Sequence, residues 1–308
     1  MSNIGSPQGD ALSPILIAIY LEAAIRELIA HGPQRPQRDL DVHLPLEAIY
    51  ADDADFMSMC AEFLEQIQLH VVPIFKEFNL IVNNDKKEET TIGHPDMLSD
   101  QSWRTTRKLG SLLGIEEHVN RRIQLALQSL NSLEALWTHR SMVAQRICIN
   151  AYRAIVESVL LYNCGTWALT EVLANKLDCT QRKMIRRVLG IKLSDKITNA
   201  DLYARCGIEP VSVQVVNARW RLFGHTLRMN KHTLARKAMA YYFFDDHHGR
   251  SGKRVTVATV LSDEYKEAGG TFIKSLEEYE AVVKLAQDRG AWKELVQKVT
   301  DKHIARCE

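Results

Sequence analysis

The segment "IYADDADFMSMC", residues 49–60, places two adjacent aspartates between two apolar runs and constrains the local fold more than any other part of the chain. The runs at 44–50 and 54–59, separated by so short a break, predict a β-hairpin with the acids at its turn. Neighbouring residues of a straight strand point to opposite faces, whereas at a turn Asp52 and Asp53 can both approach one site. Adjacent carboxylates are typical ligands of Mg²⁺, which also takes water and phosphate oxygens. A plain surface turn could hold the same pair.

The remaining pattern is mainly helical. Ser13-Pro14 is a typical helix start, because serine caps free N–H groups and proline suits the first turn, and Gly32-Pro33 stops the run. Further apolar residues recur at three- and four-residue spacing, and "RKLGSLLG" (107–114) predicts a short strand pair. The predicted helices lie at 13–31, 61–78, 119–137 and 142–169, with shorter ones towards the C-terminus. The expected fold class is therefore α+β.

Charge is unevenly spread along the chain. The net charge of the 308 residues is only +1, yet residues 176–237 hold fourteen Lys and Arg against four Asp and Glu. Such a basic segment favours a face that binds a polyanion, although a solvated helical surface has the same composition. The residues that we expect to contact phosphates are Arg182, Lys183, Arg186, Arg187, Arg219 and Arg221. For the interleaved Trp220 and Phe223 we favour packing in the core over stacking on bases.

Cysteine usage and hydropathy indicate the compartment. The six cysteines include no C-x-x-C pair, which favours reduced thiols in an intracellular protein over a disulfide framework. No apolar run is long enough to cross a bilayer, and the N-terminus has no leader-like stretch. We therefore expect an intracellular protein without a membrane partner, and the sequence does not separate nucleus from cytoplasm.

Four short motifs occur in a fixed order: "GSPQGDALSP" at 5–14, "YADD" at 50–53, "FNLIVNNDKKE" at 78–88 and "KLGSLLG" at 108–114. Together they resemble consecutive palm motifs of reverse transcriptases, most closely those of non-LTR retrotransposons. The segments "LLYNCGTWAL", "LDCTQRKMIRRVLGI", "RWRLFGHTLRM" and "LAQDRGAWKELV" resemble the thumb and C-terminal region of the same elements. Four ordered motifs are far more specific than any one of them.

The resemblance implies an RNA-directed DNA polymerase. It divides the chain into a partial palm (1–115), a helical thumb-like and basic nucleic-acid-binding region (116–236) and a C-terminal helical region (237–308). The implied partners are an RNA template, a DNA primer and a dNTP, with Mg²⁺ as cofactor.

The resemblance also implies roles for single residues. Asp52 would be a catalytic Mg²⁺ ligand with Asp53 beside it, and Leu109 and Gly110 would form the primer grip. The residues expected near the nucleotide, template and primer end are Gln8, Gly9, Tyr50, Ala51 and Lys86. Lys87 stands where the family usually has threonine, and plain readings remain open, such as a turn for Gly9 and a solvated loop for Lys86.

Nucleotidyl transfer in this family uses a third carboxylate, on a strand that precedes the "PQG" motif together with the fingers. The sequence begins seven residues before Gln8 and offers no such strand. Because metal positioning and charge stabilisation supply most of the catalysis, we predict that the chain alone is not a competent polymerase. A separate chain could supply the fingers and the carboxylate. The alternative is a non-catalytic nucleic-acid-binding protein derived from the same element.

Overall fold

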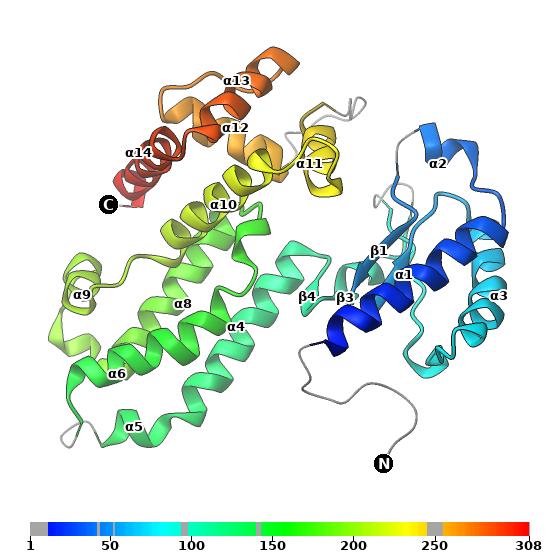
Figure 1. Cartoon of the computed structure of the whole chain (residues 1–308). Coiled ribbons are helices and arrows are strands. Elements are labelled where there is room, and N and C mark those ends of the chain that lie inside the picture. The colour runs from blue at the N-terminus through cyan, green and yellow to red at the C-terminus, as the bar shows by residue number, and fades with distance from the viewer. Residues whose placement is uncertain are drawn as a thin grey trace. The chain divides into compact units, whose positions relative to one another are not determined.

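The computed structural model describes residues 12–41, 44–51, 53–93, 98–139, 143–244 and 255–307. The chain divides into two compact units, Met1–Glu89 and Thr90–Glu308 (Figure 1). Described residues are mostly helical and include two small two-stranded antiparallel sheets. At this coarse level the structure agrees with the predicted α+β class, whereas the palm, the thumb and the divisions at 115/116 and 236/237 stay predictions.

The first unit packs two helices beside a hairpin. Its elements are α1 (Ser13–His31), α2 (Gln37–Asp41), β1 (Glu47–Tyr50), β2 (Asp53–Phe56), α3 (Ala61–Glu77) and a 3₁₀ turn at Asn84–Lys86. Two small apolar cores lie between α1 and α3, built on Ile25 and Phe75 in one and on Leu28, Phe63 and Ile67 in the other. Both long helices match their predicted spans. Ser13 is the first helical residue, and Leu12 rather than Ser13 occupies the N-cap position.

The second unit is a helical assembly that carries one short hairpin. It begins with a 3₁₀ turn (Ser102–Thr105), β3 (Arg107–Lys108), β4 (Ser111–Leu112), α4 (Ile115–Ser132), α5 (Glu134–Thr138), α6 (Gln145–Ala151), a π-helical segment (Tyr152–Glu157) and α7 (Ser158–Leu160). A 3₁₀ turn (Cys164–Thr166), α8 (Glu171–Leu189), another 3₁₀ turn (Leu193–Asp195), α9 (Asn199–Cys206), α10 (Val211–Arg228), α11 (Leu234–Phe244), α12 (Val257–Glu267), α13 (Leu276–Gln287) and α14 (Arg289–Cys307) follow. The strand pair predicted at 107–114 is confirmed.

Helix α10 connects two apolar cores within this unit. Its first turns, with Val211 and Val215, complete a core formed with α4, α6, α8 and α9. Its later turns, with Trp220 and Phe223, belong to a second core that α12, α13 and α14 complete. In Figure 1, α10 accordingly runs from the green helices towards the orange and red ones.

Two predicted helices are interrupted. The helix expected at 119–137 breaks at Leu133, between α4 and α5. The one expected at 142–169 consists of α6, a π-helical segment and α7, and ends in a turn where Asn163 adopts left-handed φ. The boundary loop predicted at 244–254 lies almost wholly outside the described residues. Within the described part of the chain, no helix combines the length and apolar composition that crossing a bilayer requires.

Candidate nucleic-acid interface

The "YADD" motif forms the turn of the β1–β2 hairpin, as predicted. Tyr50 pairs with Asp53, so the connection is a two-residue turn, and Ala51 adopts the left-handed φ of +54° that such tight turns favour. Asp53 is already the first residue of β2 and is exposed. Asp52 lies outside the described residues, so the joint approach of the two acids to one metal stays a prediction.

The hairpin register decides which side chains share a face. Because side chains alternate along a strand, Asp53 and Asp55 lie on one face together with Tyr50. Phe56 lies on the opposite face and packs against the core between α1 and α3. The carboxylates therefore occupy the face of the hairpin turned away from that core. Among the described residues, no cluster of three His, Cys, Asp or Glu side chains could hold a metal.

One further acid near the hairpin is used inside the protein. Asp39 of α2 is fully buried and accepts hydrogen bonds from Ser58 Oγ at 2.5 Å and from the Met59 amide at 2.9 Å. These bonds fix the segment that follows β2 to α2. Asp39 therefore anchors this segment.

The other residues expected at the nucleotide differ in what the structure shows. Gln8 and Gly9 lie outside the described residues. Lys86 is exposed at the end of its 3₁₀ turn, which the Asn83 side chain caps by accepting from the Asp85 amide. The neighbouring Lys87 donates to Gln68 of α3 at 2.6 Å and so ties this loop to the helix.

The predicted primer grip is the turn of the β3–β4 hairpin. Leu109 and Gly110 both have left-handed backbone conformations, with φ of +47° and +77°. Two side chains hold the turn: the Tyr162 hydroxyl donates to the Leu109 carbonyl at 2.9 Å, and Arg122 Nη2 donates to the Gly110 carbonyl at 2.5 Å. The side chain of Leu109 is exposed. The backbone of the turn is thus held by these two hydrogen bonds, while the Leu109 side chain is exposed to solvent.

His118 lies beside the two side chains that hold this turn, Arg122 and Tyr162, and its ring is neutral. The Arg122 guanidinium lies 4.0 Å from the centroid of the Tyr162 ring, and His118 Nδ1 accepts from the Leu112 amide at 3.0 Å. Burial lowers the pKa of His118 below its ordinary value, and the charge of Arg122 lowers it further. A neutral ring is what the hydrogen bond at Nδ1 requires.

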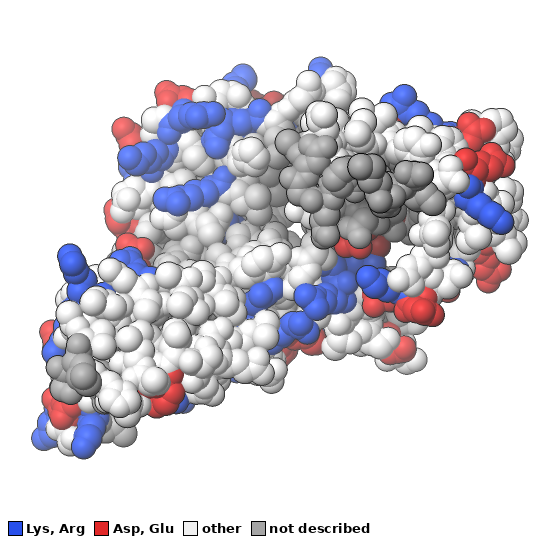
Figure 2. All heavy atoms as spheres, turned by 60° about the horizontal axis from the view of Figure 1, so that its bottom comes forward, with Lys and Arg blue, Asp and Glu red and all other residues white. Residues whose placement is uncertain are grey.

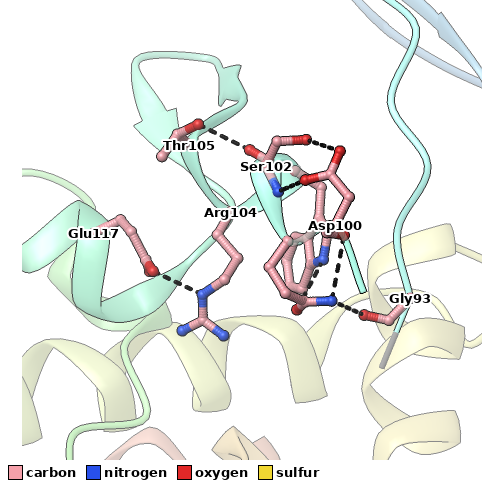
Figure 3. A network of polar contacts seen from close by, with 8 residues as sticks. Gly93, Asp100, Ser102, Arg104, Thr105 and Glu117 are labelled. Carbon is pink, nitrogen blue, oxygen red and sulfur yellow. Dashed lines mark hydrogen bonds and ion pairs between the residues drawn. The ribbon is translucent and has the colours of Figure 1, made fainter. Parts of the chain in front are cut away.

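The loop that leads into β3 is fixed by a second network (Figure 3). Asp100 accepts from the Ser102 amide and hydroxyl, and these hydrogen bonds lower the pKa of Asp100. Arg104 forms an ion pair with Glu117 of α4, with Nε 2.7 Å from the carboxylate. A Cβ at Gly114 would lie 2.7 Å from Arg104 Cβ, so this close approach requires glycine. The hairpin therefore has a fixed position on α4.

Cations concentrate around this hairpin. Burial lowers the pKa of Arg122, and the charges of Arg121 and Arg107 lower it further. The Nε of Arg121 is buried with no hydrogen-bond partner, and neither Arg121 nor Arg107 forms an ion pair with a described residue. Lys108 is the neighbour of Arg107 on β3. In Figure 2, Lys and Arg side chains are spread over the surface shown, and several of them lie side by side.

Sequence reasoning missed this cluster because it searched for charge along the chain. Arg107 lies on a strand and Arg121 and Arg122 lie on a helix, and only the fold brings the charge of Arg107 to bear on Arg122. The signal in the sequence was a basic dipeptide at the start of the "KLGSLLG" motif, Arg107-Lys108, and a second one, Arg121-Arg122, shortly after it.

The basic residues predicted on α8 follow one helix, and most have partners inside the unit. Lys183 is exposed, and Arg187, also exposed, pairs with Glu134. Arg186 donates to Asn199 Oδ1 at 3.0 Å, and Arg182 to Cys179 Sγ at 3.0 Å. Such contacts at the surface are weak and leave the cations able to meet a phosphate.

The expectation that Arg219 contacts a phosphate needs correction. It is only 3% exposed, donates to the Trp167 carbonyl at 2.6 Å and forms an ion pair with Glu264. This guanidinium is committed to the interior of the unit, so it is not placed to contact a phosphate. Arg221, two residues on, is exposed. Trp220 and Phe223 are at most 1% exposed, which confirms that both belong to the core.

Comparison with known protein families, with curated proteins and with solved structures gives no match to this chain. The geometry by itself defines a class: a mostly helical protein with a fixed, cation-flanked hairpin in one unit and an acidic hairpin turn in the other. The assignment to a family rests on the ordered motifs alone and is therefore a proposal.

Proposed function

We propose that the chain is part of a reverse transcriptase of the non-LTR retrotransposon type. We further propose that the β3–β4 hairpin and the cations near it bind the duplex of RNA template and DNA primer. The observation that carries the proposal is the β3–β4 hairpin. Its turn, Leu109 and Gly110, is held by Arg122 and Tyr162, and Arg107 and Arg121 stand beside it without carboxylate partners among the described residues.

Crowded cations of one sign favour an anionic ligand. Like charges repel in the free protein, and a phosphate that neutralises them removes this repulsion and releases counterions. Phosphate contacts of this kind fix a duplex in position without reading its sequence.

The acidic turn supplies the chemistry of the proposed enzyme. Asp53 is an exposed carboxylate at a tight turn, and with Asp52 it matches the one or two carboxylates that Mg²⁺ takes in a phosphate site. Mg²⁺ bound there would neutralise charge on the dNTP phosphates during nucleotidyl transfer. Tyr50, Ala51 and Lys86 would adjoin the nucleotide. The primer-extension assay described below tests whether this polypeptide extends a primer by itself.

A non-catalytic nucleic-acid-binding protein is the second candidate. One observation favours it: the flanking cations all lie in the second unit, Thr90–Glu308, which has two apolar cores of its own. Binding through these cations would then require neither Asp52 nor Asp53.

The test measures fluorescence anisotropy of a labelled RNA–DNA hybrid at several salt concentrations. For Arg107→Gln/Arg121→Gln we expect weaker binding and a log–log salt slope about 2 units shallower, one for each lost phosphate contact. The matched control is Lys298→Gln/Lys302→Gln, which removes the same charge from exposed positions on α14. Equal loss in both pairs would show a non-specific charge effect and contradict the assigned interface.

A primer-extension assay with Mg²⁺ on the same hybrid separates the two candidates. Extension that Asp52→Asn abolishes would establish the enzyme and refute the expected incompetence of the chain alone. If a separate fingers-bearing chain restores extension, and Asp52→Asn again removes it, the polymerase proposal stands. Binding without extension under both conditions would favour the non-catalytic protein.

A further inference from the structure

The β3–β4 hairpin depends on groups outside itself for its position. Each strand has two residues, and the pairing of Lys108 with Ser111 leaves a two-residue turn between them. In that turn Leu109 has a left-handed φ of +47°, which a residue with a side chain rarely adopts. An isolated two-stranded hairpin is marginally stable in water. The side chains that bind the hairpin from outside therefore decide where it lies.

Four described side chains hold the hairpin, and one of them titrates near neutral pH. Arg122 and Tyr162 hold the turn, and Asn163 Nδ2 donates to the hydroxyl of the first residue of β4 at 2.9 Å. His118 Nδ1 accepts from the Leu112 amide at 3.0 Å. Arginine, tyrosine and asparagine keep their charge state between pH 5 and pH 8, whereas histidine changes its charge in this range. Of the four hydrogen bonds, the one to His118 is therefore the one that depends on pH.

Two hydrogen-bond donors point at the ring of His118. The Leu112 amide meets Nδ1, and Nε of Arg122 lies 3.5 Å from Nε2. A neutral imidazole can accept at one nitrogen, whereas an imidazolium donates at both nitrogens and accepts at neither. Uptake of a proton leaves the Leu112 amide without its acceptor and places a second positive charge beside Arg122. Because Arg122 also holds the Gly110 carbonyl, protonation disturbs two of the four contacts.

The protein around His118 disfavours a charged ring. The side chain is only 2% exposed, and this burial is the main reason that its pKa is lowered. The charge of Arg122 lowers the pKa further. Of the smaller effects, the backbone of Tyr162 raises it and the charge of Arg121 lowers it.

The other neighbours of the ring do not supply a negative charge. Trp167 meets the ring edge-on, with 5.7 Å between the ring centroids. Among the described residues, no carboxylate forms an ion pair with His118. Glu117, the preceding residue of α4, is paired with Arg104 instead. A proton on His118 is therefore best accommodated if the hairpin moves away and the ring becomes solvated.

We propose that His118 is a pH-sensitive positioning residue, which holds the β3–β4 hairpin on α4 while its ring is neutral and releases the hairpin when the ring takes up a proton. The release frees Leu109 and the cations of β3 from their fixed position. That this matters for nucleic acid rests on the proposed function, because the hairpin is the part of the chain assigned there to the duplex.

Hydrogen exchange of the free protein at pH 7.5 and pH 5.5 tests the proposal. Protection factors, corrected for the pH dependence of intrinsic exchange, are compared for the amides of residues 107–112 and for those of α8. A solvated histidine has a pKa of about 6.5, so at pH 5.5 proton uptake favours the released hairpin by up to about tenfold. We expect the protection of residues 107–112 to fall by several-fold and up to this limit, while that of α8 stays constant.

Two substitutions identify the group responsible. His118→Asn keeps an acceptor oxygen near the place of Nδ1 and does not titrate, so the fall in protection should disappear. The matched control is His139→Asn, which removes an exposed histidine of the same unit and should leave the fall unchanged. Constant protection of residues 107–112 in the unaltered chain overturns the proposal without any variant. An equal fall in a folded His118→Asn protein, verified by far-UV circular dichroism, also overturns it.

Saturating RNA–DNA hybrid separates this proposal from the proposed function. A ligand that binds the held hairpin opposes its release, so the hybrid should restore the protection of residues 107–112 at pH 5.5. If protection falls equally with and without hybrid, and still depends on His118, the positioning role of His118 stands and the proposed interface alone is contradicted.

Discussion

Gly224 lies in the middle of α10, where glycine weakens a helix by about 1 kcal/mol relative to alanine. Its presence has a steric reason. A Cβ at this position would lie 2.5 Å from Cε2 of Trp292 and closer still to Nε1, far inside the ordinary contact distance. Trp292 is buried and packs against Trp220 and Phe223, so it has little room to withdraw.

We predict that Gly224→Ala destabilises the second unit by about 2 kcal/mol. Overpacking of a rigid core costs up to about 3 kcal/mol, and the helix propensity of alanine returns about 1 kcal/mol. Urea unfolding followed by tryptophan fluorescence and far-UV circular dichroism measures the difference. The matched control is His225→Ala, at the next and exposed position of α10, which should change stability by a few tenths of a kcal/mol.

A double-mutant cycle isolates the contact. In a Trp292→Leu background the clash is relieved, so Gly224→Ala should become neutral or stabilising, with a coupling energy of about 2 kcal/mol. If Gly224→Ala alone were as stable as the unaltered chain, α14 would be able to yield at this point and the steric explanation of Gly224 would be refuted.

Three further predictions follow from buried charges and uneven packing. Glu264→Gln should lower the free energy of unfolding in urea by about 3 kcal/mol, because it leaves the buried Arg219 without its counter-ion. Glu267 lies on the same helix, α12, and forms an exposed ion pair with Arg306, so Glu267→Gln should cost under about 1 kcal/mol. Because the folded-state pKa of His118 lies below its ordinary value, His118 contributes stability above about pH 6.5, and this contribution is lost as the pH falls through the folded-state pKa. His118→Gln should therefore remove this part of the pH dependence of the free energy of unfolding. An unchanged dependence would contradict the role given to His118. Amides of the β1–β2 hairpin should exchange with solvent faster than those of α8, because two four-residue strands on small cores are less stable than a helix of the largest core, and equal protection would count against this.

The elements that the sequence predicted correctly are those with local causes. The β1–β2 hairpin follows from two apolar runs on either side of the short break at 51–53, and α1 follows from Pro14 at its start and Gly32 after its end. The β3–β4 hairpin likewise depends on Leu109 and Gly110 in its turn. In each case the residues that decide the conformation are neighbours in the chain.

The features that escaped prediction depend on partners far along the chain. Arg219 was expected to contact phosphate because it belongs to the basic segment 176–237, and its partner Glu264 is 45 residues away. The cluster of Arg107, Arg121 and Arg122 escaped for the same reason. No local pattern shows that a strand arginine will act on an arginine of a helix that follows it in the chain.

The segments that extend the resemblance beyond the palm motifs meet around α10. The carbonyl of Trp167, from "LLYNCGTWAL", accepts from Arg219, from "RWRLFGHTLRM". Gly224 of the latter segment gives room to Trp292 of "LAQDRGAWKELV". These residues are therefore explained by packing within the second unit.

That explanation changes how the resemblance should be used. Residues that pack identify a fold, and they carry no information about a ligand. Contact with nucleic acid has to be sought in the exposed or crowded cations outside those packed positions, such as Arg107 and Arg121. Substitutions of the two kinds should separate: Gly224→Ala should alter unfolding with little effect on the affinity of the folded protein, whereas Arg107→Gln/Arg121→Gln should alter affinity and its salt dependence with little effect on unfolding. If both kinds changed affinity and stability together, packing and binding would share residues, and the proposed interface would have to be redrawn around α10.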